Sequence, residues 1–208
     1  MGLGLQDLEK EDDFEETENF NYRKESVLDA IRSRGGWLVF FFLGLVVAAF
    51  VIEEFHDILR REVELSYFVP LLIGHGGNTG SQAVASVIRA MAMGHVSPVD
   101  LPYVLRKEAI TGCMIGMLLG VVIFMVSFMW SGLSVMVGLT VAISLPVVSL
   151  WANALGGLFP LLAVKFGYNP AVTSAPLMTT VVDSSGLIIY FYIARWMLPG
   201  SIQAVVDP

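Results

Sequence analysis

The chain has 208 residues, of which 55% are hydrophobic and 15% are charged, and its mean hydropathy is +0.71. Soluble globular domains contain about 25% charged residues, so this composition predicts an integral membrane protein. The single cysteine, Cys113, excludes an intrachain disulfide and argues against structural zinc, and no basic cluster interleaved with aromatic residues indicates nucleic-acid binding.

Residues 1–24 are acidic and poor in apolar side chains, and they contribute most of the formal net charge of −7. Such a composition predicts a solvated, disordered tail, with binding of a divalent ion as the alternative. The clustered acidic residues are Asp7, Glu9, Glu11, Asp12, Asp13, Glu15, Glu16 and Glu18.

Residues 25–34 predict a short amphipathic helix at the membrane surface, because Val27, Leu28 and Ile31 recur at helical spacing. The glycine pair at 35–36 is expected to end this helix. The expected organisation is an acidic cytoplasmic tail with the short helix at 1–34, a five-helix transmembrane domain at 35–200, and a C-terminal tail at 201–208.

Five apolar segments follow, at residues 37–52, 66–93, 109–130, 133–164 and 171–198. A bilayer span needs about 20 residues at about 1.5 Å each, so the predicted fold is all-α with five transmembrane helices. The longer segments must tilt, kink or protrude, and the fourth has candidate breaks at Pro146, Gly156-Gly157 and Pro160. Six spans are the alternative, which no charged loop supports.

The orientation follows from the positive-inside rule. With five spans, nine Lys and Arg residues lie on the side of the N-terminus and three lie on the other side. The N-terminus is therefore expected in the cytoplasm and the C-terminus outside, in a plasma or inner membrane.

The fifth segment holds a single charge near its middle. Asp183 is the only charged residue between Lys165 and Arg195. An ionised Asp at the centre of a spanning helix costs roughly 2.5–3.5 kcal/mol, which a cation or a water-filled pore can offset. We therefore favour an ion-handling role for Asp183 over a structural acid bonded to a neighbouring helix. The residues that share its helical face are Pro176, Thr179, Thr180 and Tyr190.

The second segment has a glycine-rich middle that also carries polar side chains. Irregular or weakened helix in lipid is tolerated only where it packs closely on protein or lines a wet cavity. The segment therefore predicts a pore lining, with a small-residue packing seam through Gly76 and Gly80 as the alternative. The residues concerned are Gly74, His75, Gly76, Gly77, Asn78, Thr79, Gly80, Ser81 and Gln82.

Other residues of the apolar segments are predicted to serve packing. Gly112, Gly116 and Gly120 repeat at every fourth position of the third segment, which allows another helix to approach closely. His75 and Asn153 are expected to be hydrogen-bonded inside the bundle rather than to bind a ligand.

Two long motifs carry a resemblance. The runs Pro70-Leu-Leu-…-Gly-Gly-Asn-Thr-Gly-Ser-Gln82 and Pro176-Leu-Met-Thr-Thr-Val-Val-Asp183-Ser-Ser-Gly-Leu-Ile-Ile-Tyr190 resemble the membrane domain of the MgtE family of magnesium channels and its eukaryotic solute-carrier relatives. The resemblance covers residues 30–198. It implies a homodimer in membrane lipid with one central pore between the second and fifth helices of both protomers, and it places the metal-binding carboxylate at Asp183. The expected pore-lining residues are Gly74, Gly77, Asn78, Pro176, Thr179 and Thr180.

The function that this resemblance implies is Mg²⁺ transport, with no catalytic residues and no enzyme activity. Mg²⁺ prefers octahedral oxygen ligands and releases its waters reluctantly, so two facing Asp183 side chains could hold a hydrated ion through its waters. Mn²⁺, Co²⁺ and Ca²⁺ also accept oxygen ligands. The alternatives are a Na⁺-coupled exchanger that exports Mg²⁺ and a non-transporting membrane scaffold.

Overall fold

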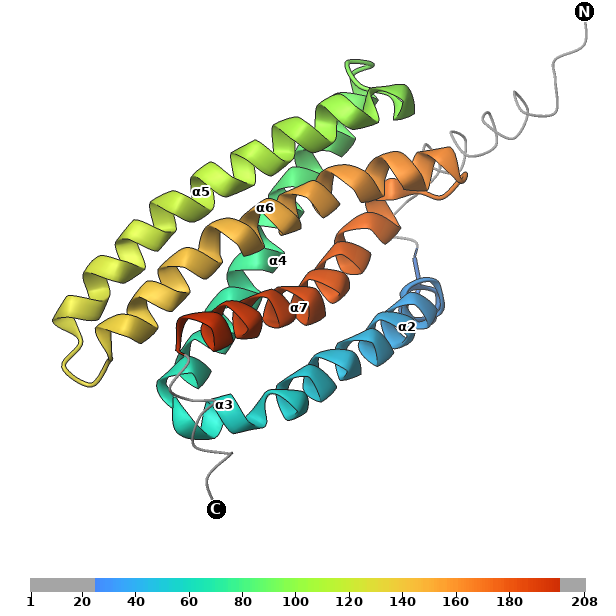
Figure 1. Cartoon of the computed structure of the whole chain (residues 1–208). Helices are drawn as coiled ribbons and strands as arrows, with labels where there is room; N and C mark the ends of the chain where they lie inside the picture. Colours follow the sequence, from blue (N-terminus) through green and yellow to red (C-terminus); the bar gives the residue numbers. More distant parts are fainter. Residues whose placement is uncertain (1–24, 199–208) are drawn as a thin grey trace, which may run out of the picture. The chain divides into compact units, whose positions relative to one another are not determined.

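A computed structural model describes residues 25–198, so the acidic run at 7–18 and the predicted tail at 201–208 lie outside the described residues. Within this range the chain is nearly all helical and has no strand, which confirms the predicted all-α class. The helices are α2 (Val27–Glu54), α3 (His56–Arg61), α4 (Glu64–Ala92), the short 3₁₀ helix η1 (Pro98–Asp100), α5 (Leu101–Met129), α6 (Val135–Lys165) and α7 (Pro170–Met197) (Figure 1).

The chain divides into two compact units, residues 1–39 and 40–208. In the described part of the first unit, Ser26 starts α2: its hydroxyl donates to the Asp29 carboxylate at 2.6 Å and accepts from the Asp29 N–H at 3.2 Å. This reciprocal pairing satisfies backbone donors that the first turn of a helix leaves without partners.

The helix that starts there does not end at the glycine pair 35–36, so the predicted break is wrong. α2 is continuous from Val27 to Glu54. Each glycine costs a helix only about 1 kcal/mol relative to alanine, and in an apolar environment breaking the backbone hydrogen bonds costs more.

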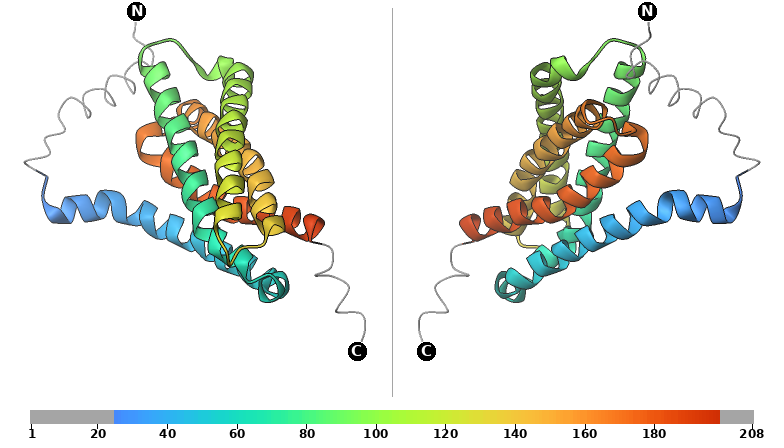
Figure 2. Two further views of the ribbon diagram at one scale, coloured as in Figure 1. Left: turned by 90° about the vertical axis from the view of Figure 1, so that its left-hand side faces the viewer. Right: turned by 90° about the vertical axis from the view of Figure 1, so that its right-hand side faces the viewer.

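In the second unit α6 is the central helix, and it packs against α4, α5 and α7. α5 and α6 run side by side, and α7 lies on the other side of α6 from α5 (Figures 1 and 2). α6 is a single helix through Pro146 and Pro160, so the candidate breaks and the six-span division are not observed.

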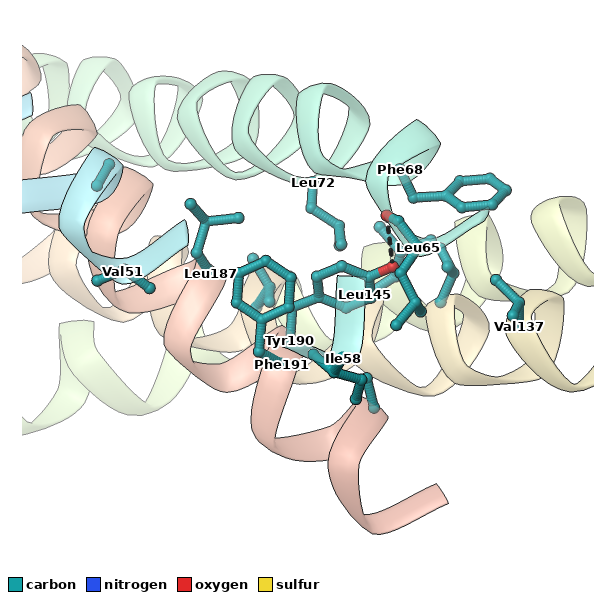
Figure 3. Packing of buried hydrophobic residues seen from close by; sticks show 14 of the residues in the cluster. Val51, Ile58, Leu65, Phe68, Leu72, Val137, Leu145, Leu187, Tyr190 and Phe191 are labelled. Atoms are coloured by element: carbon teal, nitrogen blue, oxygen red, sulfur yellow. Dashed lines mark hydrogen bonds between the residues drawn. The ribbon is translucent and has the colours of Figure 1, made fainter. Parts of the chain in front are cut away.

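The largest buried cluster joins α4, α6 and α7 with the ends of α2 and α3. Tyr190 is fully buried, and its hydroxyl donates to the backbone carbonyl of Leu65 at 3.0 Å (Figure 3). This bond ties the start of α4 to the last turns of α7. The labelled residues of the cluster are Val51, Ile58, Leu65, Phe68, Leu72, Val137, Leu145, Leu187, Tyr190 and Phe191.

The predicted close approach at the glycines of the third segment is confirmed. A Cβ atom added to Gly116 would lie 2.5 Å from the Cα of Pro146, and one added to Gly120 would lie 2.5 Å from the carbonyl oxygen of Ala142. Real Cβ atoms do not come this close to backbone, so α5 and α6 pack backbone to backbone as small-residue membrane interfaces do.

Among residues 25–198, four helices are long and apolar enough to cross a membrane: α2, the stretch Pro98–Met129, α6 and α7. The third span thus starts before the predicted residue 109, because Ser97 and Asp100 form a capping box that begins the helical stretch earlier. α4 has a comparable length of 29 residues, but its glycine-rich, polar middle makes its mean hydropathy lower than that of the four candidate spans.

Two glycine-to-alanine variants test the α5–α6 contact. We expect Gly116→Ala to lower the unfolding free energy by roughly 1–3 kcal/mol, because the added methyl must push two helix backbones apart. Gly36→Ala is the matched control, since a Cβ there meets nothing within 4 Å, and alanine in a helix should be neutral or stabilising by up to about 1 kcal/mol. The measurement is unfolding in detergent followed by circular dichroism. Equal stability of the two variants would contradict the backbone contact.

Candidate functional site

Asp183 lies in the middle of α7 and is partly buried. Among residues 25–198, no hydrogen bond or ion pair to its carboxylate is found; the ion pairs of this range are Arg34–Glu25 and His56–Asp57. The alternative is that Asp183 is a structural acid bonded to a neighbouring helix. No residue in the described part of the chain makes such a bond. The carboxylate is available to a group from outside it.

α4 and α7 run antiparallel and touch through glycines of α4. A Cβ on Gly76 would lie 2.8 Å from Cγ1 of Val182, and a Cβ on Gly80 would lie 2.8 Å from Cε of Met178. Higher residue numbers on α4 thus lie beside lower residue numbers on α7, as expected for antiparallel helices. In this register Asp183 lies at the level of the turn that contains Gly74.

The glycine-rich segment divides into two faces. Gly76 and Gly80 are buried against α7 and α6, as the packing seam predicts. Gly74 and Asn78 are exposed, and a Cβ added to Gly74 would meet nothing within 4 Å. One helical turn further on, Gln82 is exposed as well. The open face of α4 therefore carries Gly74, Asn78 and Gln82 at every fourth position, beginning with Gly74 at the level of Asp183.

The predicted face of α7 around Asp183 meets two different helices, α4 and α2. A Cβ on Gly77 of α4 would lie 3.6 Å from Cγ2 of Thr179, whereas the methyl of Thr180 packs on Gly44 of α2. The sequence analysis missed Gly44, although a glycine inside an otherwise bulky apolar helix is a signal of close approach. Asp183, one turn beyond both threonines, thus lies on α7 next to the face that meets α2 and the face that meets α4.

The threonine hydroxyls bond within their own helix. Thr179 donates to the carbonyl of Pro176 at 2.9 Å, and Thr180 donates to the same oxygen at 2.8 Å. Their protons are used in these bonds, so each hydroxyl offers only oxygen lone pairs to its surroundings. Acceptor oxygens are the groups that a hydrated cation binds through its waters.

C-terminal to Asp183, two side-chain hydrogen bonds hold α7 against α6 and α4. Trp151 of α6 donates from Nε1 to the hydroxyl of Ser185 at 2.7 Å, and Tyr190 donates to Leu65 at 3.0 Å. The bond at Ser185, two residues after Asp183, thereby fixes the rotation of α7 about its own axis.

α4 is joined to α6 by a buried polar network. Asn153 donates from Nδ2 to the Thr79 hydroxyl at 2.7 Å and to the Ser149 carbonyl at 2.9 Å. The Ser149 hydroxyl donates to the Leu145 carbonyl at 2.6 Å, so it accepts from Nε2 of His75, 2.7 Å away. The prediction that His75 and Asn153 are hydrogen-bonded interior residues is confirmed.

The described residues contain no group of three or more His, Cys, Asp and Glu side chains that could hold a metal ion. The described part of the chain therefore offers the carboxylate of Asp183 and the oxygens around it, rather than a closed ligand cage. Such a site fits an ion that keeps most of its own waters.

Over residues 25–198, the fold and this site define a helical integral membrane protein with an unpaired acid near the middle of a helix that is long and apolar enough to span a membrane. The family model of MgtE, described as a divalent cation transporter, matches residues 69–193, from α4 to the last turns of α7. The chain belongs to this family. Membership in a transporter family confirms the prediction that it is not an enzyme.

Three curated relatives are similar over most of the chain, and each bears the name Magnesium transporter MgtE. The protein of Thermus thermophilus is 33% identical over 166 residues, that of Bacillus subtilis 35% over 159 residues, and that of Enterococcus faecalis 31% over 178 residues. These matches cover 80%, 76% and 84% of this chain, but 36%, 35% and 38% of the relatives. The chain therefore spans about a third of the length of the curated relatives it matches.

A double-mutant cycle tests the network between α4 and α6. We expect Thr79→Val and Asn153→Ala to couple by about 0.6 kcal/mol, the average for hydrogen bonds between membrane helices. The control pair is Thr111→Val with Asn153→Ala, because Thr111 bonds only to the Lys107 carbonyl of its own helix at 2.9 Å. Unfolding free energies in detergent should be additive within about 0.3–0.5 kcal/mol for the control. Additivity for both pairs would show that the bond adds nothing to the packing.

Proposed function

We propose that this chain forms the pore of a divalent cation transporter that carries Mg²⁺, with the carboxylate of Asp183 as its ion-selecting group. The observation that supports this most strongly is the unpaired Asp183, which lies level with the open turn of Gly74 on the antiparallel helix. Membership in a family described as divalent cation transporters supports the same conclusion, as do relatives named for magnesium.

The energetic argument starts from the cost of the acid. An ionised Asp at the bilayer centre costs roughly 2.5–3.5 kcal/mol, and no basic partner among residues 25–198 offsets it. A divalent cation and its waters offset this cost more fully than a monovalent ion, because the Coulomb attraction grows with the charge.

The proposed pore is a homodimer, because one carboxylate cannot enclose an ion. Two copies of Asp183 that face each other would hold Mg²⁺ through its water shell, which the ion releases reluctantly. Mn²⁺, Co²⁺ and Ca²⁺ accept the same oxygen ligands and would compete. The proposed lining consists of the exposed face of α4 and the adjacent face of α7, with Gly74, Gly77, Asn78, Pro176, Thr179 and Thr180.

In this proposal α4 is a fifth span. Its polar face would meet the aqueous path rather than lipid, which explains how a helix below the usual hydropathy crosses the bilayer. The membrane domain is residues 35–200 of a plasma or inner membrane protein. The N-terminus is cytoplasmic and the C-terminus is outside, by the distribution of Lys and Arg.

Flux into liposomes tests the role of the carboxylate. We expect Asp183→Asn to lower Mg²⁺ uptake by about tenfold or more, since an amide keeps the shape but loses the charge that attracts the ion. The control is Asp57→Asn, the same change at an Asp of α3 whose side chain is 71% exposed, and its flux should equal that of the unmodified chain. Equal flux in both variants would remove Asp183 from the mechanism.

Thermal unfolding with Mg²⁺ separates transport from a scaffold role. A ligand at about 100 times its Kd stabilises a protein by about 2.7 kcal/mol, so Mg²⁺ should raise the melting temperature of the unmodified chain and not that of Asp183→Asn. A scaffold predicts no shift in either protein. A Na⁺ gradient imposed in the liposome assay then distinguishes the exchanger, whose Mg²⁺ flux would follow that gradient, from a channel.

A further inference from the structure

A second concave site lies where the C-terminal ends of α2 and α7 approach each other within the second unit. It is a groove of about 340 Å³, within the size range of small-molecule sites. On α7, the groove runs from Ile188, five residues beyond Asp183 or about 7.5 Å along the helix, to Arg195, twelve residues beyond it or about 18 Å. The charged end of the groove therefore lies apart from the proposed ion site. Its lining residues are Val47, Phe50, Val51, Glu54, Phe55, Ile188, Tyr192 and Arg195.

The walls of the groove are apolar and its floor is packed. Phe55 stacks on Phe191 with ring centroids 5.0 Å apart and meets Tyr192 edge to face at 5.4 Å. Val51 is buried, whereas Phe50 is 63% exposed on the open side. The groove thus has a fixed base and an open apolar flank.

Two opposite charges line the same groove without pairing. Glu54 ends α2 and Arg195 lies in the last turn of α7, and both are exposed. The ion pairs within residues 25–198 are Arg34–Glu25 and His56–Asp57, so Glu54 and Arg195 lie more than 4.0 Å apart. The gap leaves room for a group that carries both charges.

The position of these charges matches the headgroup level of a bilayer. Both lie at the ends of helices that are long and apolar enough to span. Tyr192 is 60% exposed and Trp196 is 76% exposed beside Arg195. Exposed aromatic residues at the ends of spans mark the membrane–water interface, so the apolar part of the groove extends into hydrocarbon.

We propose that this groove binds a zwitterionic phospholipid with a primary amine, of the phosphatidylethanolamine type. An acyl chain lies along Phe50, Val51 and Ile188, the phosphate binds the guanidinium of Arg195, and the ammonium binds the carboxylate of Glu54. The membrane is as apolar as the groove, so burial of the acyl chain does not select among lipids. The headgroup selects: guanidinium matches phosphate, and a primary ammonium donates hydrogen bonds to a carboxylate that a choline group cannot.

Native mass spectrometry of the full chain in detergent tests this site. The probes are phosphatidylethanolamine, phosphatidylcholine and phosphatidylglycerol with identical acyl chains. We expect the unmodified protein to prefer the ethanolamine lipid by about tenfold over each of the others, the effect of one charge-assisted hydrogen bond. Equal retention of all three lipids would overturn the proposal.

Two variants assign the headgroup contacts. Glu54→Gln should bring the ethanolamine and glycerol lipids within about twofold of each other, because it removes the partner of the amine. Arg195→Gln should weaken both lipids by about tenfold, because both carry the phosphate. The matched control is Arg60→Gln on α3, which does not line the groove and should behave as the unmodified chain.

Melting temperatures in detergent confirm that each variant is folded before lipids are compared. If Glu54→Gln and Arg195→Gln bind lipids as the unmodified chain does, the site is overturned. Lipid found on monomers but excluded from dimers would also overturn it, since the groove would then be covered by a second copy. Neither outcome bears on Mg²⁺ flux, so this proposal and the proposed transport function fail independently.

Discussion

The constraint on which this structure depends is that hydrocarbon offers no hydrogen-bond partners, so the helices must satisfy one another's polar groups. His75, Thr79, Ser149 and Asn153 do so across α4 and α6, and Trp151 reaches the hydroxyl of Ser185 across α6 and α7. Against this background the carboxylate of Asp183 stands out, because the part of the chain that the structure describes leaves it unbonded. The side chains of this network are paired, whereas the carboxylate of Asp183, near the middle of α7, is not, which makes it a functional signal.

Backbone contact at glycines gives the polar network its precision. α5 lies against α6 along Gly112, Gly116 and Gly120, and α4 lies against α7 at Gly76 and Gly80. Helices this close cannot rotate without collision. α4 therefore keeps Gly76 and Gly80 inward and Asn78 and Gln82 outward, so the packing seam and the proposed pore lining use two faces of one segment.

α2 contributes differently from α4, α5 and α7, the three α-helices that pack against α6. Within the second unit, it touches α7 at Gly44 and through the cluster around Val51, while many of its large apolar side chains are exposed. In a membrane such a surface belongs to lipid or to a second copy of the chain. The groove beside its last turn adds charges to that surface, which is what turns general solvation by lipid into selection of a headgroup.

The sequence alone determined the helical class, most of the spans, the glycine contacts of α5 and the position of Asp183, because hydropathy, residue size and an isolated charge are local properties. It failed at the glycine pair 35–36 and at the start of α5, where weak local preferences yield to backbone hydrogen bonding and capping. Only the tertiary structure decided that Thr180 meets Gly44, that His75 bonds to Ser149, and that Gly74 is open at the level of Asp183. Those facts depend on how helices distant in sequence are rotated against one another, and periodicity within a single helix carries no information about that.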